Sequence, residues 1–205
     1  MIFLYFLWLI HTECGYIGAM NFDLQEARKS LSKPITMIGM MGTGKTHMGR
    51  LLAQKLAWPF FDSDHLVEEK AGCPISVIFD IWGEQKFRDV EARTIRDLLS
   101  MKRCVIATGG GAIMNEETAD AIFNHSSAVW VQADIDTILN RVSKNKNRPL
   151  LACENPKDVL QKLMEQRKDT YARAPFTLDS MKNNDEGAAM ALLEDIYNDV
   201  MHGAR

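Results

Sequence analysis

The sequence lacks the features of proteins that depend on disulfides, structural zinc or a membrane span. Its 205 residues include only four cysteines, at Cys14, Cys73, Cys104 and Cys153, with no C-x-x-C pair, so neither a disulfide framework nor a zinc site is indicated. The apolar run at residues 2–10 has nine residues, and a helix of that length spans about 14 Å of a hydrocarbon core about 30 Å thick. No basic residue precedes this run and no small-residue cleavage site follows it, which disfavours a secretory signal.

Neither sign of charge is in large excess. The chain has 24 Lys and Arg residues against 27 Asp and Glu residues, a formal net charge of −3, which argues against nucleic-acid binding through bulk positive charge. Apolar residues make up 46% of the chain and charged residues 25%, the mixture of an ordinary globular protein with a full core. We expect a cytoplasmic monomer with no nucleic-acid partner and no stable membrane insertion.

After Pro34, short apolar runs alternate with longer amphipathic segments, a pattern typical of an α/β fold with a parallel sheet and helices on both faces. The predicted strands are residues 35–38, 59–61, 104–107, 128–131 and 176–178. The predicted helices are residues 45–56, 65–71, 75–82, 85–101, 116–123, 134–142, 156–172 and 186–201. Residues 143–156 interrupt this pattern with a polar, proline-containing stretch, so we expect a mobile loop there.

Residues 39–46, G-M-M-G-T-G-K-T, match the phosphate-binding motif G-x-x-x-x-G-K-[ST] at every fixed position. The motif follows a predicted strand and opens a predicted helix, which is the context it requires. Its glycines allow backbone N–H groups to point at phosphate oxygens, and the helix adds its positive dipole end. We therefore expect Lys45 to bind the β- and γ-phosphates of a nucleotide and the Thr46 hydroxyl to bind Mg²⁺.

Two carboxylates follow the second predicted strand, in the sequence Phe61-Asp62-Ser63-Asp64. They are expected at the carboxyl edge of the sheet beside the phosphate loop, where open α/β folds bind ligands. In an extended stretch the two side chains would share a face, so one carboxylate could serve the Mg²⁺ shell while the other reaches an acceptor hydroxyl. The alternative role for the pair is to cap the following helix.

A second glycine cluster, Thr108-Gly109-Gly110-Gly111, follows the third predicted strand. Residues without side chains let a small ligand approach the backbone closely and offer it N–H donors. The alternative is a plain strand-to-helix turn, but such a turn needs only one or two glycines. We therefore predict a binding site for a small acceptor molecule at this cluster.

Taken together, the motifs resemble the shikimate kinase family. The resemblance runs from about Pro34 to the carboxyl end and rests on six strings in order, G-M-M-G-T-G-K-T, F-D-S-D, G-E-Q-K-F-R-D-V-E, A-T-G-G-G, N-R-P-L-L and Q-R-K-D-T-Y. It implies a three-layer P-loop kinase fold like that of nucleoside-monophosphate kinases, with a five-stranded parallel sheet of order 2-3-1-4-5, flanking helices and a mobile lid. It also implies phosphoryl transfer from MgATP to the 3-hydroxyl of shikimate, which gives shikimate 3-phosphate and ADP in chorismate and aromatic amino acid biosynthesis.

The resemblance also implies roles for individual residues. Shikimate would be bound by Asp64, Arg88, Gly109, Gly110, Gly111 and Arg167, with the two arginines holding its carboxylate. The catalytic residues would be Asp64, Lys45 and Arg148, the last closing from the lid. The nucleotide would be bound by Gly42, Thr43, Gly44, Lys45, Thr46, His47, Arg141 and Arg148, and Mg²⁺ by Thr46 and Asp62. His47 stands where the family commonly has Ser or Thr, so a hydroxyl contact to the α-phosphate is lost and the backbone N–H of His47 remains for it.

We predict two regions in the chain. Residues 1–33 form an N-terminal extension that is flexible or reflects a mis-assigned start, and residues 34–205 form the P-loop domain, with the lid at about 143–156. One alternative function is another small-metabolite P-loop kinase, such as a gluconate kinase or a nucleoside-monophosphate kinase, although the T-G-G-G cluster and the arginines in F-R and Q-R disfavour it. The other is a nucleotide-binding module without catalysis, although no residue of the catalytic set is missing.

Overall fold

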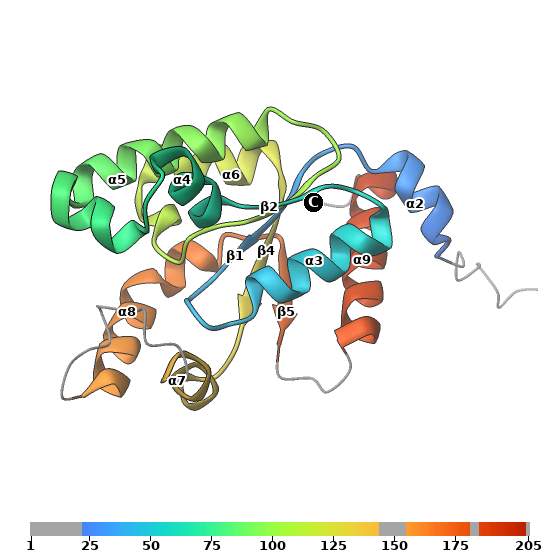
Figure 1. The fold of residues 1–205 in the computed structure, drawn as a ribbon. Helices are drawn as coiled ribbons and strands as arrows, with labels where there is room; N and C mark the ends of the chain where they lie inside the picture. Colours follow the sequence, from blue (N-terminus) through green and yellow to red (C-terminus); the bar gives the residue numbers. More distant parts are fainter. Residues whose placement is uncertain (1–21, 144–154, 181–184, 204–205) are drawn as a thin grey trace, which may run out of the picture.

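The computed structural model describes residues 22–143, 155–180 and 185–203 of the chain. The elements in these ranges are, in order, α2 (Leu24–Ser30), β1 (Ile35–Ile38), α3 (Lys45–Leu56), β2 (Phe60–Asp62), α4 (Ser63–Ala71), α5 (Ile75–Leu99), β3 (Val105–Ala107), the 3₁₀ helix η1 (Ala112–Met114), α6 (Glu116–His125), β4 (Ser127–Gln132), α7 (Ile135–Ser143), α8 (Pro156–Tyr171), β5 (Phe176–Asp179) and α9 (Asp185–His202). The predicted alternation of strands and helices is confirmed (Figure 1).

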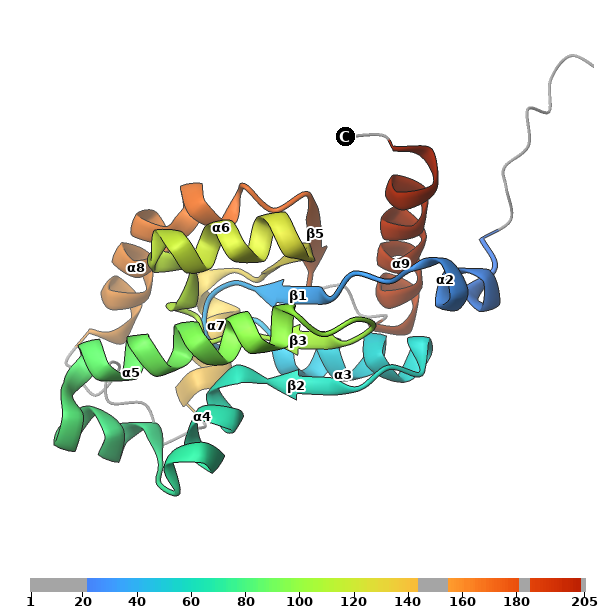
Figure 2. The same cartoon turned by 90° about the horizontal axis from the view of Figure 1, so that it is seen from above.

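Five strands form one parallel sheet in the predicted order, β2-β3-β1-β4-β5. Helices α2, α3 and α9 pack on one face of this sheet, and α5, α6 and α8 pack on the other (Figure 2). Because both faces are covered, strands of continuous apolar sequence are stable here, and every residue of β1 and β3 is buried. The three-layer arrangement predicted for the chain is therefore present.

Alternation along the strands divides the core in two. In β1, Met37 belongs to the same apolar cluster as Leu52 of α3 and Leu193 of α9. The next residue, Ile38, belongs to the cluster that contains Ile95 of α5. Successive side chains of a strand point to opposite faces, so a single short strand supports both helical layers.

Most boundaries lie within one or two residues of the prediction, and two features in the α4–α5 region have a clear local cause. Helix α4 begins at Ser63 rather than at His65, because the Asp62 side chain caps its first turn and accepts hydrogen bonds from the Asp64 and His65 N–H groups. Helix α5 spans both predicted helices 75–82 and 85–101, and Gly83 between them is not helical, with φ 77° and ψ 167°. Glycine adopts a positive φ without steric cost, and this conformation kinks α5 between the two predicted segments.

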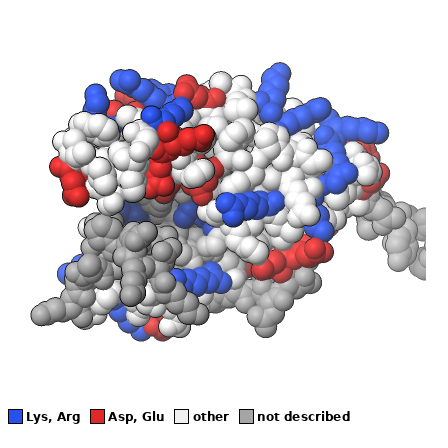
Figure 3. Space-filling model, viewed as in Figure 1, with Lys and Arg blue, Asp and Glu red and all other residues white. Residues whose placement is uncertain are grey.

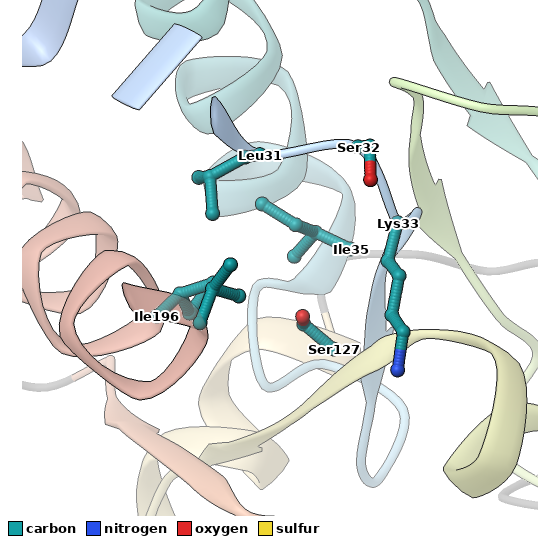
Figure 4. A pocket seen from close by; sticks show the side chains of 7 residues that line it. Leu31, Ser32, Lys33, Ile35, Ser127 and Ile196 are labelled. Atoms are coloured by element: carbon teal, nitrogen blue, oxygen red, sulfur yellow. The ribbon is translucent and has the colours of Figure 1, made fainter. Parts of the chain in front are cut away.

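Residues 22–33, which the sequence analysis placed in the N-terminal extension, include α2 on the outside of α3 and α9. Ala27 and Leu31 are buried in the core, and the ring of Phe22 packs edge-on against Tyr197 of α9 at 5.9 Å between centroids. Beside them, at the amino ends of β1 and β4, lies a pocket with an apolar lining from Leu31, Ile35 and Ile196 (Figure 4). Within the described ranges no helix combines the length and the apolar content needed to cross a bilayer.

Candidate active site

The sequence motifs meet at the carboxyl edge of the sheet, the end opposite the apolar pocket. The phosphate loop follows β1, Asp62 is the last residue of β2, and the second glycine cluster follows β3. Asp62 is in register with Ala107, so the first carboxylate and the glycine cluster lie on neighbouring strands. The space-filling view shows side chains of both charges around a hollow below α4 and α5 (Figure 3).

The phosphate loop encloses the ammonium group of Lys45. Its Nζ donates hydrogen bonds to the carbonyl oxygens of Gly39 at 2.9 Å and Met40 at 2.8 Å. Gly44 is the N-cap of α3 and has φ 99°, a backbone conformation that residues other than glycine rarely adopt. The loop thus holds a buried cation at the N-terminus of a helix, which is an anion-binding arrangement.

Both carboxylate oxygens of Asp62 accept hydrogen bonds. Oδ2 accepts a hydrogen bond from the Thr46 hydroxyl at 2.8 Å, and Oδ1 caps α4. Cap and metal ligand are therefore compatible roles for this side chain. The expectation that Asp62 and Asp64 share a face of an extended stretch is wrong, because the cap turns the chain into α4 and Asp64 lies in its first helical turn.

Asp64 and Glu91 of α5 bring two carboxyl oxygens to Gly109. A Cβ atom at Gly109 would lie 2.6 Å from Asp64 Oδ1 and 2.5 Å from Glu91 Oε1, so any side chain at this position would displace these carboxylates. Both oxygens are buried and have no hydrogen-bond partner among the described residues. Buried acceptors of this kind are normally satisfied in proteins, so the pair is suited to accept hydrogen bonds from the hydroxyls of a small ligand.

Burial raises the pKa of both acids. Burial, then the negative charges of Glu91 and Asp62, raises the pKa of Asp64 to about 6. Burial likewise raises the pKa of Glu91, although the guanidinium of Arg88 acts in the opposite direction. Asp64 can therefore accept a proton from a ligand near neutral pH and is a stronger base than an exposed aspartate.

Arg88 lies against the glycine cluster. Its Nη1 donates to Glu91 Oε2 at 2.7 Å and its Nη2 to Glu84 Oε1 at 3.2 Å. A Cβ atom at Gly111 would lie 2.8 Å from Arg88 Nη2, which places the guanidinium beside that residue. Because the Glu91 side chain is only 3% exposed, this ion pair belongs to the site rather than to the open surface.

Arg167 of α8 approaches the glycine cluster at its middle residue. Its Nη1 donates to the carbonyl oxygen of Gly110 at 3.0 Å, and the Tyr171 hydroxyl donates to the same oxygen at 2.6 Å. Both Arg167 and Tyr171 are buried. The two predicted arginines thus reach one glycine cluster from different helices, Arg88 at Gly111 and Arg167 at Gly110.

Two of the predicted nucleotide-binding residues, Arg141 and His47, make side-chain contacts near the phosphate loop. Arg141 of α7 donates from Nη1 to the Thr43 carbonyl at 3.2 Å and to the Ser180 hydroxyl at 2.9 Å. The ring of His47 lies 2.9 Å from the carboxylate of Asp185. Arg148 and most of the predicted lid, residues 144–154, lie outside the described residues, so their roles stay predictions.

The sequence analysis assigned no role to Glu91, although it lies in the string F-R-D-V-E. A usable signal was present, because an acidic residue three positions after Arg88 on a predicted helix is spaced for an ion pair. The spacing of Arg88 and Glu91 in the sequence does not indicate that the second oxygen of Glu91 faces Asp64 and Gly109, as it does in the structure.

Comparison with known proteins agrees with this geometry. A family model described as shikimate kinase matches residues 41–197. The chain is 40% identical to a shikimate kinase of Bartonella henselae over 167 residues, which are 82% of this chain and 80% of that relative. It matches the structure of a shikimate kinase from Acinetobacter baumannii in complex with shikimate with a TM-score of 0.75 and 36% identity, over 87% of this chain and 98% of that one. A gluconokinase from Sinorhizobium meliloti, with a TM-score of 0.55 and 14% identity, shares the fold alone. The chain belongs to the shikimate kinase family.

Proposed function

We propose that this chain transfers the γ-phosphoryl group of ATP to the 3-hydroxyl of shikimate, forming shikimate 3-phosphate and ADP. The observation that carries the proposal is the pair of buried carboxyl oxygens of Asp64 and Glu91 at Gly109, which have no hydrogen-bond partner in the part of the chain that the structure describes. They lie in one site with the Lys45 ammonium and the Arg88 guanidinium. The positive charges of Lys45 and Arg88 are close enough to lower the pKa of Asp64, against the larger effect of burial. Acceptor-binding and phosphate-binding groups are therefore neighbours.

The acceptor side of the site suits a molecule with one carboxylate and several hydroxyls. Arg88 and Arg167 offer forked cationic donors for the carboxylate of shikimate, and each such bond contributes about 1.5 to 3 kcal/mol. Gly109, Gly110 and Gly111 allow close approach of the ring, and Asp64 and Glu91 accept from hydroxyls. Gluconate also has a carboxylate and hydroxyls, but on an open chain. A comparison of shikimate with gluconate as acceptors therefore tests whether the site requires the ring.

Phosphoryl transfer depends mainly on positioning and on neutralising charge. In the proposed reaction the 3-hydroxyl attacks the γ-phosphorus, the bond to the bridging oxygen of ADP breaks, and Asp64 takes the hydroxyl proton. Lys45 stabilises charge on the β- and γ-phosphates, and Arg148 is proposed to do so from the lid. Closure of the site would keep water from competing with the acceptor hydroxyl.

The nucleotide half of the proposal includes Mg²⁺. The Thr46 hydroxyl and the Asp62 carboxylate are oxygen donors 2.8 Å apart, the ligand type that Mg²⁺ prefers alongside phosphate oxygens. When bound, the ion would neutralise negative charge on the phosphates. The N–H groups of Gly42, Thr43, Gly44, Lys45, Thr46 and His47 would bind the phosphates, with Arg141 beside adenine.

The acceptor assignment is tested by a coupled ADP-release assay with shikimate, quinate and gluconate, each with MgATP. We expect shikimate to stimulate ADP release far more strongly than quinate or gluconate. Stimulation by gluconate without stimulation by shikimate would overturn the proposal. Light scattering of the purified chain tests the further proposal that it is a monomer, which a stable dimer would contradict. Turnover by the purified chain with MgATP and shikimate alone tests the proposal that no protein or nucleic-acid partner is needed.

A further inference from the structure

A side-chain contact between His47 and Asp185 connects α3, the helix that follows the phosphate loop, to α9. His47 is in the first turn of α3, two residues after Lys45, and Asp185 is the first residue of α9. The atoms His47 Nε2 and Asp185 Oδ2 are 2.9 Å apart. The carboxylate can only accept, so the ring nitrogen is the donor. The phosphate-binding motif asks only for a backbone N–H at position 47, so it leaves this side-chain contact without an explanation.

Hydrogen bonds from Arg141 also connect the phosphate loop to the residue that follows β5. Arg141 bonds both the loop carbonyl of Thr43 and the hydroxyl and carbonyl of Ser180, which follows β5. A Cβ atom at Gly44 would lie 3.8 Å from Arg141 Nη1 and 3.8 Å from the Ser180 Cβ. The end of the phosphate loop is thus linked to Ser180 through Arg141, and its helix is linked to Asp185 through His47.

We propose that the His47–Asp185 pair is a positioning element of the nucleotide site. This inference rests on the proposed function, because it concerns the ATP of that reaction. The pair fixes the start of α9 against the first turn of α3 before the nucleotide arrives, which lowers the cost of ordering the site on binding. It also gives the Asp185 carboxylate a donor, so that this negative group does not stand unpaired beside bound phosphates.

A second ion pair joins the same two helices and provides a matched control. Lys55 Nζ lies 3.2 Å from Glu186 Oε2, and Lys55 is in the last turn of α3, two helical turns from His47. Exposed pairs contribute little to folding stability, and the His47 and Asp185 side chains are 69% and 49% exposed. Loss of either pair should therefore leave the fold intact, whereas only loss of the His47–Asp185 pair should weaken nucleotide binding.

The test is calorimetric titration of MgADP into the full chain and its variants, together with the KM for ATP and for shikimate. We expect His47→Ala to raise the Kd of MgADP about two- to fivefold and the KM for ATP with it, while the KM for shikimate stays at the wild-type value. The double variant with Asp185→Asn should bind MgADP no worse than His47→Ala alone, because both changes break one contact. His47→Gln keeps a side-chain donor and should restore most of the affinity.

Lys55→Met should leave the Kd of MgADP unchanged. The inference is overturned if Lys55→Met weakens MgADP as much as His47→Ala does, if the changes at His47 and Asp185 add fully, or if His47→Ala binds MgADP like the wild type. A wild-type chain that fails to bind MgADP at all would instead overturn the proposed function, so the two failures are distinguishable.

Discussion

Arg88 donates a 2.7 Å hydrogen bond to the buried carboxylate of Glu91, and this bond holds its guanidinium beside Gly111. The other oxygen of Glu91 faces Asp64 at Gly109 and has no hydrogen-bond partner within residues 22–143, 155–180 and 185–203. Glu91 therefore links the two halves of the acceptor site. It orients the cation proposed to bind the acceptor carboxylate, and it raises the pKa of the carboxyl proposed to take the hydroxyl proton.

Replacement of Glu91 by Gln should weaken shikimate binding. The variant loses a charge-assisted bond of about 1.5 to 3 kcal/mol, so we expect the KM for shikimate to rise about tenfold or more while MgADP binds as before. Glu84→Gln is the matched control, because Glu84 also contacts Arg88, at 3.2 Å, but its side chain is 67% exposed. Equal losses in the two variants would contradict a special role for the buried partner.

The pH profile of kcat/KM for shikimate should report Asp64. Asp64 must be ionised to take a proton, so kcat/KM should rise with pH and level off above a pKa of about 6. In Glu91→Gln the rising limb should move to lower pH, because the charge of Glu91 raises the pKa of Asp64. A wild-type profile that is flat from pH 5 to pH 8 would argue against Asp64 as the base.

The same shift predicts how Asp64 affects folding stability. Its folded pKa is about 6, above the ordinary value of 3.8, so the folded state binds the proton more tightly than the unfolded state. The resulting stabilisation is fully present below pH 3.8 and is lost as the pH rises through about 6. Urea unfolding should therefore find Asp64→Asn more stable than the wild type at pH 8, by about 2 to 3 kcal/mol, and equally stable at pH 4. A less stable variant at pH 8 would contradict the assigned burial cost.

The features predictable from the sequence are those fixed by local pattern. The apolar runs at β1 and β3 identify strands because both faces of the sheet are covered. The G-x-x-x-x-G-K-[ST] spacing predicts the loop around Lys45 because glycine conformations and the helix N-terminus are local properties. The sheet order followed from the family resemblance rather than from the pattern.

The features that escaped prediction depend on which side chains meet across the fold. The sequence offered a helix cap and a metal ligand as alternative roles for the Asp62/Asp64 pair, and it did not indicate that one oxygen of Asp62 caps α4 while the other accepts from Thr46. The approach of Glu91 to Asp64 requires α5 to pack beside the first turn of α4, and a sequence pattern does not contain that distance. The separation of the predicted helices 75–82 and 85–101, by contrast, is a local feature, and the non-helical backbone of Gly83 lies between them.

Turnover of Asp64→Asn tests the central claim most directly. The claim is that this buried carboxyl takes the proton of the attacking hydroxyl, and loss of such a group typically slows a reaction roughly a hundredfold to ten-thousandfold. The measurement is kcat with saturating shikimate and MgATP, alongside the Kd of MgADP for the same preparation. We predict that kcat falls by that factor while MgADP binds as in the wild type, and a kcat close to the wild-type value would contradict the account.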